Sequence, residues 1–210
     1  RASRSRGAFR RAGAMNPRQR ALIGLTLVAA GTAPWLRSWL EADMTRHMLL
    51  QFPLLVLAGT ALASSLPPRV RAACATINAH GLAGLLLCLL VSGFWMIPRA
   101  LDQALLLPQM EFAKFATLLA AGGALQLSWR GAGTMIQTFF IGNWAWMTAV
   151  AGLLYQDVSA RLCNAYLLDE QVVAGRGLVV LALIMPTVLV GLLMMRGGLA
   201  ANPDAPMTAD

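Results

Sequence analysis

The sequence predicts an all-α, polytopic integral membrane protein, a bundle of about six transmembrane helices with both termini in the cytoplasm. Two observations carry this fold class. Hydrophobic residues make up 58% of the 210 residues and charged residues only 12%, against roughly 45–50% and 25% in soluble domains. The apolar residues also gather in long stretches, and a helix needs about 20 of them to cross a bilayer. This composition excludes a soluble enzyme, a coiled coil and a protein that is mainly a disordered tail.

Six apolar stretches have the required length. They run over residues 21–40, 47–66, 72–98, 111–129, 134–155 and 178–195. The chain therefore divides into a basic cytoplasmic N-terminal tail over 1–20, a six-helix transmembrane domain over 21–196 and a flexible cytoplasmic C-terminal tail over 197–210. Because six spans leave only loops and tails, we expect no folded soluble domain.

The stretches differ in how cleanly they predict a span. Pro34 and Arg37 interrupt the first, which also has the basic and apolar parts of a signal peptide; we expect a retained helix. The second carries no charge after its first residue, and Pro53 is expected only to bend it, as Pro186 bends the sixth. Pro67-Pro68-Arg69 separates the second span from the third. Arg130-Gly131-Ala132-Gly133 separates the fourth from the fifth.

Charge predicts the orientation of the bundle. Six spans place both termini on one side, where 11 of the 17 basic residues lie, seven of them within the first 20 positions. Seven of the nine acidic residues belong to the opposite side. Basic loops stay in the cytoplasm, so the acidic side is the outer face. The net charge of +8 thus reports orientation in a multi-pass bacterial inner membrane protein, whose partner is the lipid bilayer and not nucleic acid.

The cysteines and histidines do not predict a heme. Cys74, Cys88 and Cys163 form no CxxC, CxxCH or CxC pattern, which argues against a c-type heme and against a paired-thiolate copper carrier. His47 and His80 lie about 20 and 10 residues from the turn of the helical hairpin that carries them. At 1.5 Å per residue their depths differ by about 15 Å, so one iron cannot take both. A heme held by His80 and a methionine stays open as an alternative without positive support, and His80 is interpreted as an internal hydrogen-bonding residue.

Potential metal ligands gather at the predicted outer face. Asp43, Met44 and His47 share one helical face just before the second span, Met96 ends the third span and Glu111 begins the fourth. Thioether and imidazole groups suit Cu(I), while carboxylates suit harder divalent ions. The sequence therefore offers Asp43, Met44, His47, Met96 and Glu111 as candidate metal ligands, with copper as the metal.

A structural interpretation of the same residues stays open. Methionine is abundant in this chain, with 11 residues, and it commonly fills apolar gaps. Glu111 lies three residues before Lys114, a spacing at which the two side chains form an ion pair on a helix. His47 close to Asp43 is then a hydrogen-bonded histidine at the membrane interface.

Four segments, in order, resemble those of CtaG-type cytochrome c oxidase assembly factors. DMTRHMLLQFPLLVLAG resembles that family's H-M-x-x-H helix, and FWMIPRALDQALLLP resembles its W-H-x-P segment and the loop after it. EFAKFATLLAAG resembles the start of its H-x-x-x-H helix, and YLLDEQVVAGRGLVV resembles its D-x-Q-x-A-G segment. The resemblance covers residues from about 40 to 195, and each motif by itself is short and apolar.

The family's histidines are mostly replaced in this chain. Carried over position by position, the family's five histidines fall on Asp43, His47, Met96, Glu111 and Phe115. Only His47 is retained, whereas three replacements are other potential ligands and Phe115 is not a ligand. The resemblance implies a divergent member whose outer-face site is either retuned or lost.

The resemblance implies a role in assembling a heme–copper oxidase, with copper handled at the outer face. A heme–copper oxidase subunit or a periplasmic copper carrier would then be the partner. We expect no enzyme, because the chain carries no Ser/His/Asp set and no Walker or Rossmann glycine pattern. The alternative is a non-metal accessory subunit or scaffold of a membrane respiratory complex. A small-solute permease fits less well, since few polar residues fall within the spans.

Overall fold

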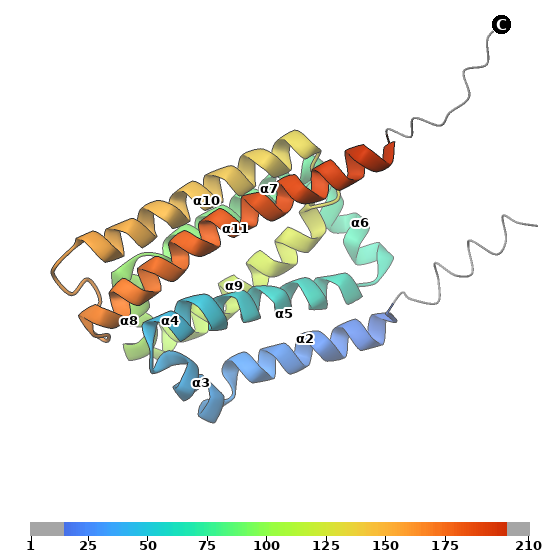
Figure 1. Cartoon of the computed structure of the whole chain (residues 1–210). Coiled ribbons are helices and arrows are strands. Elements are labelled where there is room, and N and C mark those ends of the chain that lie inside the picture. The colour runs from blue at the N-terminus through green and yellow to red at the C-terminus, as the bar shows by residue number, and fades with distance from the viewer. Residues whose placement is uncertain (1–14, 201–210) are drawn as a thin grey trace, which may run out of the picture.

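The computed structural model describes residues 15–200, and within them every regular element is a helix (Figure 1). The elements are α2 (Pro17–Thr32), α3 (Pro34–Glu41), α4 (Met44–Arg46), the π-helix η1 (His47–Gln51), α5 (Phe52–Ser65), α6 (Pro68–Ile77), the 3₁₀-helix η2 (Ala79–Gly81), α7 (Leu82–Trp95), α8 (Pro98–Leu106), α9 (Pro108–Ser128), α10 (Thr134–Asp157) and α11 (Leu168–Ala200). The all-helical part of the predicted fold class is confirmed.

The long helices α2, α5, α7, α9, α10 and α11 run lengthwise through one elongated bundle (Figure 1). α5 packs between α2 and α9, α9 packs on α7, and α10 joins α7 to α11. α11 also contacts α4 and η1, which closes the ring of helices at one end. That end, formed by α3, α4, α8 and the 158–167 loop, is called the α8 end. The start of α2, α6 and the end of α11 lie at the other, the α6 end (Figure 1).

Prolines set many of the helix boundaries. Pro is found in the first two positions of α2, α3, α6, α8 and α9, where its missing N–H costs no helical hydrogen bond. The residue before a proline avoids helical angles, and Ala33 accordingly has ψ 129°. The predicted first helix over 21–40 is therefore two helices, α2 and α3. Pro186, by contrast, lies inside a continuous α11.

The predicted third helix over 72–98 is also broken. His80 and Gly81 have positive φ values of 57° and 74°, and α6 meets the η2–α7 helix at 72°. Glycine adopts such angles freely, and here a Cβ would also collide with the backbone carbonyl of Ser128. His80 is exposed at this kink, so the interpretation of His80 as an internal residue is wrong. The polar side chain that does bond there is Asn78, which donates to Ser128 Oγ at 2.7 Å.

Two helices are long and apolar enough to cross a membrane, Met44–Ser65 and Leu168–Met195. Two bent helix pairs reach the same criterion together, α6 with η2–α7 and α8 with α9, the second bent by 118°. The structure thus supports a helical membrane protein with two to four candidate spans. Neither α2–α3 nor α10 is among them, so the predicted total of six stays a prediction.

The predicted tails are described only in part. Residues 1–14 and 201–210 lie outside the described residues, and with them most of both tails. Where the structure does describe these regions, α2 already begins at Pro17 and α11 continues to Ala200. Helix ends do not mark the membrane, so the bounds of the predicted transmembrane domain over 21–196 stay a prediction.

The apolar core is concentrated toward the α8 end. One buried cluster joins α4, η1, α8, α10 and α11 through Met44, Met48, Leu101, Tyr155, Cys163, Tyr166, Ala174 and Leu178. A second joins α5, α7, α8 and α9 around Leu55 and Trp95. Tyr155 donates a hydrogen bond to the Met96 carbonyl at 2.6 Å, which satisfies the end of α7. These clusters surround and position the polar residues described next.

Candidate functional site

A lysine without solvent exposure forms the centre of the polar residues at the α8 end. Lys114 belongs to α9, and its side chain is 0% exposed. Its ammonium lies 2.6 Å from Glu41 Oε1, 3.0 Å from His47 Nε2 and 3.2 Å from Gln51 Oε1. An ammonium has three N–H donors and no acceptor, so each of its protons faces one acceptor. Glu41, His47, Gln51, Lys114 and Tyr166 are together called the Lys114 cluster.

Gln51 ties the cluster to the rest of the bundle. While its amide oxygen accepts from Lys114, its Nε2 donates to Glu41 Oε1 and to the Gly31 carbonyl, both at 3.0 Å. One buried side chain thus links α2, α3 and α9. Breaking any of these contacts would leave a buried polar group unpaired, which costs more than the hydrogen bond itself contributes.

The hydrogen bonds fix the tautomer of His47. Lys114 can only donate, so His47 Nε2 accepts and the ring proton resides on Nδ1. His47 Nδ1 therefore donates to the Tyr166 hydroxyl, 2.6 Å away, and Tyr166 donates to the Glu41 carbonyl at 3.0 Å. Burial, followed by the charge of Glu41, raises the pKa of Tyr166, which keeps this donor protonated. Every donor in this series of hydrogen bonds, from the Lys114 ammonium through His47 and Tyr166 to the Glu41 carbonyl, thus meets an acceptor.

A second ion pair borders the cluster. Arg37 on α3 pairs with Glu111 on α9, and its Nε lies 3.9 Å from Glu41 Oε2. The formal charges of Arg37, Glu41, Glu111 and Lys114 cancel. The predicted pairing of Glu111 with Lys114 is wrong, because Lys114 turns inward to Glu41 while Glu111, one turn earlier and partly exposed, reaches Arg37.

Local sequence explains why His47 and Gln51 face Lys114. Pro53 has no N–H, so the carbonyl one turn earlier lacks its normal α-helical partner. The backbone over His47–Gln51 widens into a π-helix, a rare element that occurs mostly as a single turn inside α-helices. His47 and Gln51 are four residues apart and lie on one face. Both side chains are completely buried, although a charge-free apolar helix was expected here.

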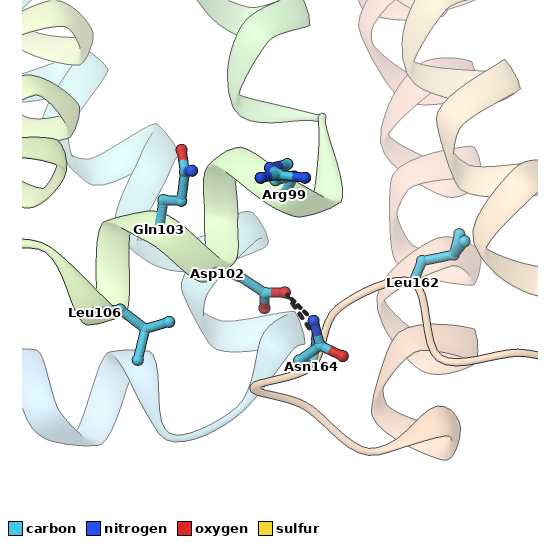
Figure 2. A pocket seen from close by; sticks show the side chains of 6 residues that line it. All are labelled: Arg99, Asp102, Gln103, Leu106, Leu162 and Asn164. Carbon is cyan, nitrogen blue, oxygen red and sulfur yellow. Dashed lines mark hydrogen bonds between the residues drawn. The ribbon is translucent and has the colours of Figure 1, made fainter.

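Tyr166 reaches the cluster because a buried aspartate holds its loop. Figure 2 shows Asp102 on α8 turned toward Asn164 of the 158–167 loop, beside an open pocket that these two residues line with Arg99, Gln103, Leu106 and Leu162. The Asp102 carboxylate accepts from the backbone N–H groups of Asn164 and Ala165 at 2.8 and 3.1 Å. It also accepts from Asn164 Nδ2 at 3.3 Å. We call these contacts the Asp102 clamp.

Cys163 reports on the state of the Asp102 clamp. Burial and the nearby charge of Asp102 raise the pKa of the Cys163 thiol to about 12, so at neutral pH the reactive thiolate is nearly absent. We expect Asp102→Ala to lower stability by about 1–3 kcal/mol through the unpaired N–H groups. It also removes the nearby charge and exposes the thiol. Maleimide labelling of Cys163 at pH 7, read by mass spectrometry, should therefore become faster.

The control for this measurement is Asp157→Ala, which removes an exposed carboxylate at the end of α10. It should leave the labelling rate of Cys163 unchanged. Equal labelling of the wild type and Asp102→Ala would show that Asp102 does not hold the loop.

The predicted metal ligands are engaged in other contacts. Asp43 caps α4 by accepting from the Arg46 N–H at 3.0 Å, Glu111 pairs with Arg37, and both nitrogens of His47 are hydrogen-bonded. The structure does bring Met44 and Met96 into one cluster, but among apolar side chains and Tyr155. Within residues 15–200 no three His, Cys, Asp or Glu side chains form a metal-binding group. In this structure the five predicted residues are thus engaged in other contacts, and copper binding by them stays a prediction.

The prediction identified His47 but missed its partners. The charge pattern places Glu41 at the outer face without a partner, the apolar run places Gln51 in a membrane helix, and no sequence motif marks Tyr166. The sequence does carry a usable signal, because Gln51 and Lys114 are the polar residues within two otherwise apolar stretches, LLQFPLL and FAKFA. Polar groups in such positions need an internal partner.

Comparisons with known protein families, curated proteins and solved structures found no match to this chain.

Proposed function

We propose that this chain is a membrane-embedded accessory or assembly protein of a heme–copper oxidase, which acts by docking and holds no metal at His47. The oxidase rests on the resemblance of four ordered segments to CtaG-type assembly factors. The metal-free mode of action rests on one observation, the engagement of both imidazole nitrogens of His47 by Lys114 and Tyr166. A copper ligand needs a free nitrogen lone pair, and here that lone pair accepts from a buried ammonium.

The proposal includes a topology. The six long helices cross the bacterial inner membrane, and the α6 end lies in the cytoplasm. In its support, the sequence assigns 11 of the 17 basic residues to the side of the α6 end, seven of them within the first 20 positions, and basic segments stay in the cytoplasm. The described acidic residues belong to the elements of the opposite end. The Lys114 cluster then lies near the outer membrane interface.

The Lys114 cluster suits a docking protein because it holds α3, η1, α9 and the 158–167 loop in one arrangement. A rigid end presents the same surface to every partner molecule. Next to the cluster, α3 exposes Trp35 and Trp39, and the Arg46 guanidinium lies 4.6 Å from the Trp39 ring centre. Tryptophan and arginine are enriched where proteins meet partners and, for tryptophan, at membrane interfaces.

Co-purification tests the proposal. A tagged chain, cross-linked in native membranes and extracted in mild detergent, should recover named subunits of a heme–copper oxidase with their heme absorption. His47→Ala should recover the same subunits if the variant remains folded, since His47 holds no metal. Deleting the gene should lower the amount of assembled oxidase. Absence of oxidase subunits together with normal oxidase levels after deletion would contradict the proposed function.

A further inference from the structure

The groups around Lys114 are those of a cation site. A carboxylate oxygen from Glu41, an imidazole nitrogen from His47 and an amide oxygen from Gln51 surround one position at 2.6, 3.0 and 3.2 Å. Carboxylate, imidazole and amide oxygen are all common ligands of divalent metal ions. They come from α3 and η1, and the position itself is filled by the ammonium of a residue on α9. The lysine ammonium is a compact point charge.

The cluster needs a positive charge at this position. The Glu41 carboxylate is only 12% exposed, and a buried carboxylate without a partner is strongly destabilised. The other cation nearby is Arg37, which pairs with Glu111 and approaches Glu41 only to 3.9 Å. Lys114 is therefore the group that neutralises Glu41.

We propose that the Lys114 ammonium is a built-in cation that stands in the place of a metal ion among Glu41, His47 and Gln51. The site then needs no metal ion, and one substitution is expected to convert it into a site for a divalent cation. Lys114→Ala removes the alkyl chain and the ammonium, and leaves a space ringed by the same three acceptors. A divalent cation that enters this space finds the His47 Nε2 lone pair free. This inference does not depend on the proposed oxidase.

Cobalt binding tests the inference. We expect detergent-purified Lys114→Ala to bind one Co²⁺ per chain, with a visible absorption band, and to gain about 5 °C in Tm at 100 times the dissociation constant. n-Propylammonium, which has the atoms that the substitution removes, should also raise Tm and should compete with Co²⁺. The wild type should show neither response. In the control variant His47→Ala/Lys114→Ala, Co²⁺ binding should fall at least about tenfold.

Each outcome decides the inference. If Lys114→Ala is unstable, it is extracted with n-propylammonium present and then exchanged into Co²⁺. Failure of both cations to restore the folded protein would overturn the built-in cation, since the site would need the lysine itself. A His47-dependent cobalt band in the wild type would also overturn it, because the metal site would then be open with Lys114 in place. Oxidase co-purification is read separately, so either proposal can fail alone.

Discussion

Lys114→Ala should lower the free energy of unfolding by about 3–5 kcal/mol, the range measured when one partner of a buried ion pair is removed. Its ammonium is completely buried and bonds three groups. Without it, the Glu41 carboxylate loses its nearest counter-charge while the Gln51 oxygen and His47 Nε2 lose their donor. Unfolding in mixed micelles, followed by tryptophan fluorescence and circular dichroism in the absence of divalent ions, measures the change.

The matched control removes both charges. Glu41→Gln/Lys114→Met leaves no unpaired charge, and exchange of a buried ion pair for neutral groups is often nearly neutral. The double variant should therefore be more stable than Lys114→Ala. If Lys114→Ala matched the wild type in the absence of any added cation, Lys114 would not be holding the cluster together.

Gly122→Ala should lower stability by about 1–3 kcal/mol, the cost of overpacking a close contact. α5 and α9 approach so closely that a Cβ on Gly122 would collide with the Val56 carbonyl, and a Cβ on Gly59 with the Leu119 carbonyl. Small residues permit this approach between membrane helices. Because backbone atoms cannot rotate away, the helices must separate, and the register that sets Lys114 against His47 and Gln51 is disturbed. The same unfolding experiment measures the loss.

The adjacent residue supplies the control for this prediction. A Cβ on Gly123 would lie 3.7 Å from the Ala63 Cβ, an ordinary van der Waals contact. Gly123→Ala should thus keep or slightly raise stability, since alanine restricts the unfolded chain. Equal losses in both variants would show that the close α5–α9 contact at Gly122 does not decide the outcome, because helix propensity favours alanine over glycine at both positions.

The helices were predictable because apolar length and proline positions are local features. The second and fourth predicted stretches fall on η1–α5 and on α9 with small boundary shifts. The breaks at Ala33 and His80 were missed. Pro34 was noted only as a weakness of the first stretch, although a proline commonly begins a new helix. The kink at His80 depends on a close approach to Ser128 of α9, a tertiary contact that no local pattern contains.

The site was less predictable than the helices. Spacing along α9 favoured a pair between Glu111 and Lys114, whereas Lys114 bonds to Glu41, 73 residues away. The acids Glu41 and Glu111 could pair with the bases Arg37 and Lys114 in more than one way. The orientation of α9 relative to α3 decides which pairs form. The Asp102 clamp, which carries Tyr166 to His47, joins residues more than 60 positions apart. The ligand types at the outer face and the resemblance both indicate His47, but neither indicates the lysine that engages it.

Cu(I) titration of the purified protein tests the central claim, that His47 is held by Lys114 and Tyr166 and not by a metal. Wild type and His47→Ala are titrated anaerobically against a chromogenic Cu(I) chelator, with metal content measured beforehand. Each protein's folded fraction is checked by circular dichroism. The account predicts the same titration for both, with no His47-dependent copper. One equivalent of Cu(I) bound by the wild type and lost in folded His47→Ala would contradict it.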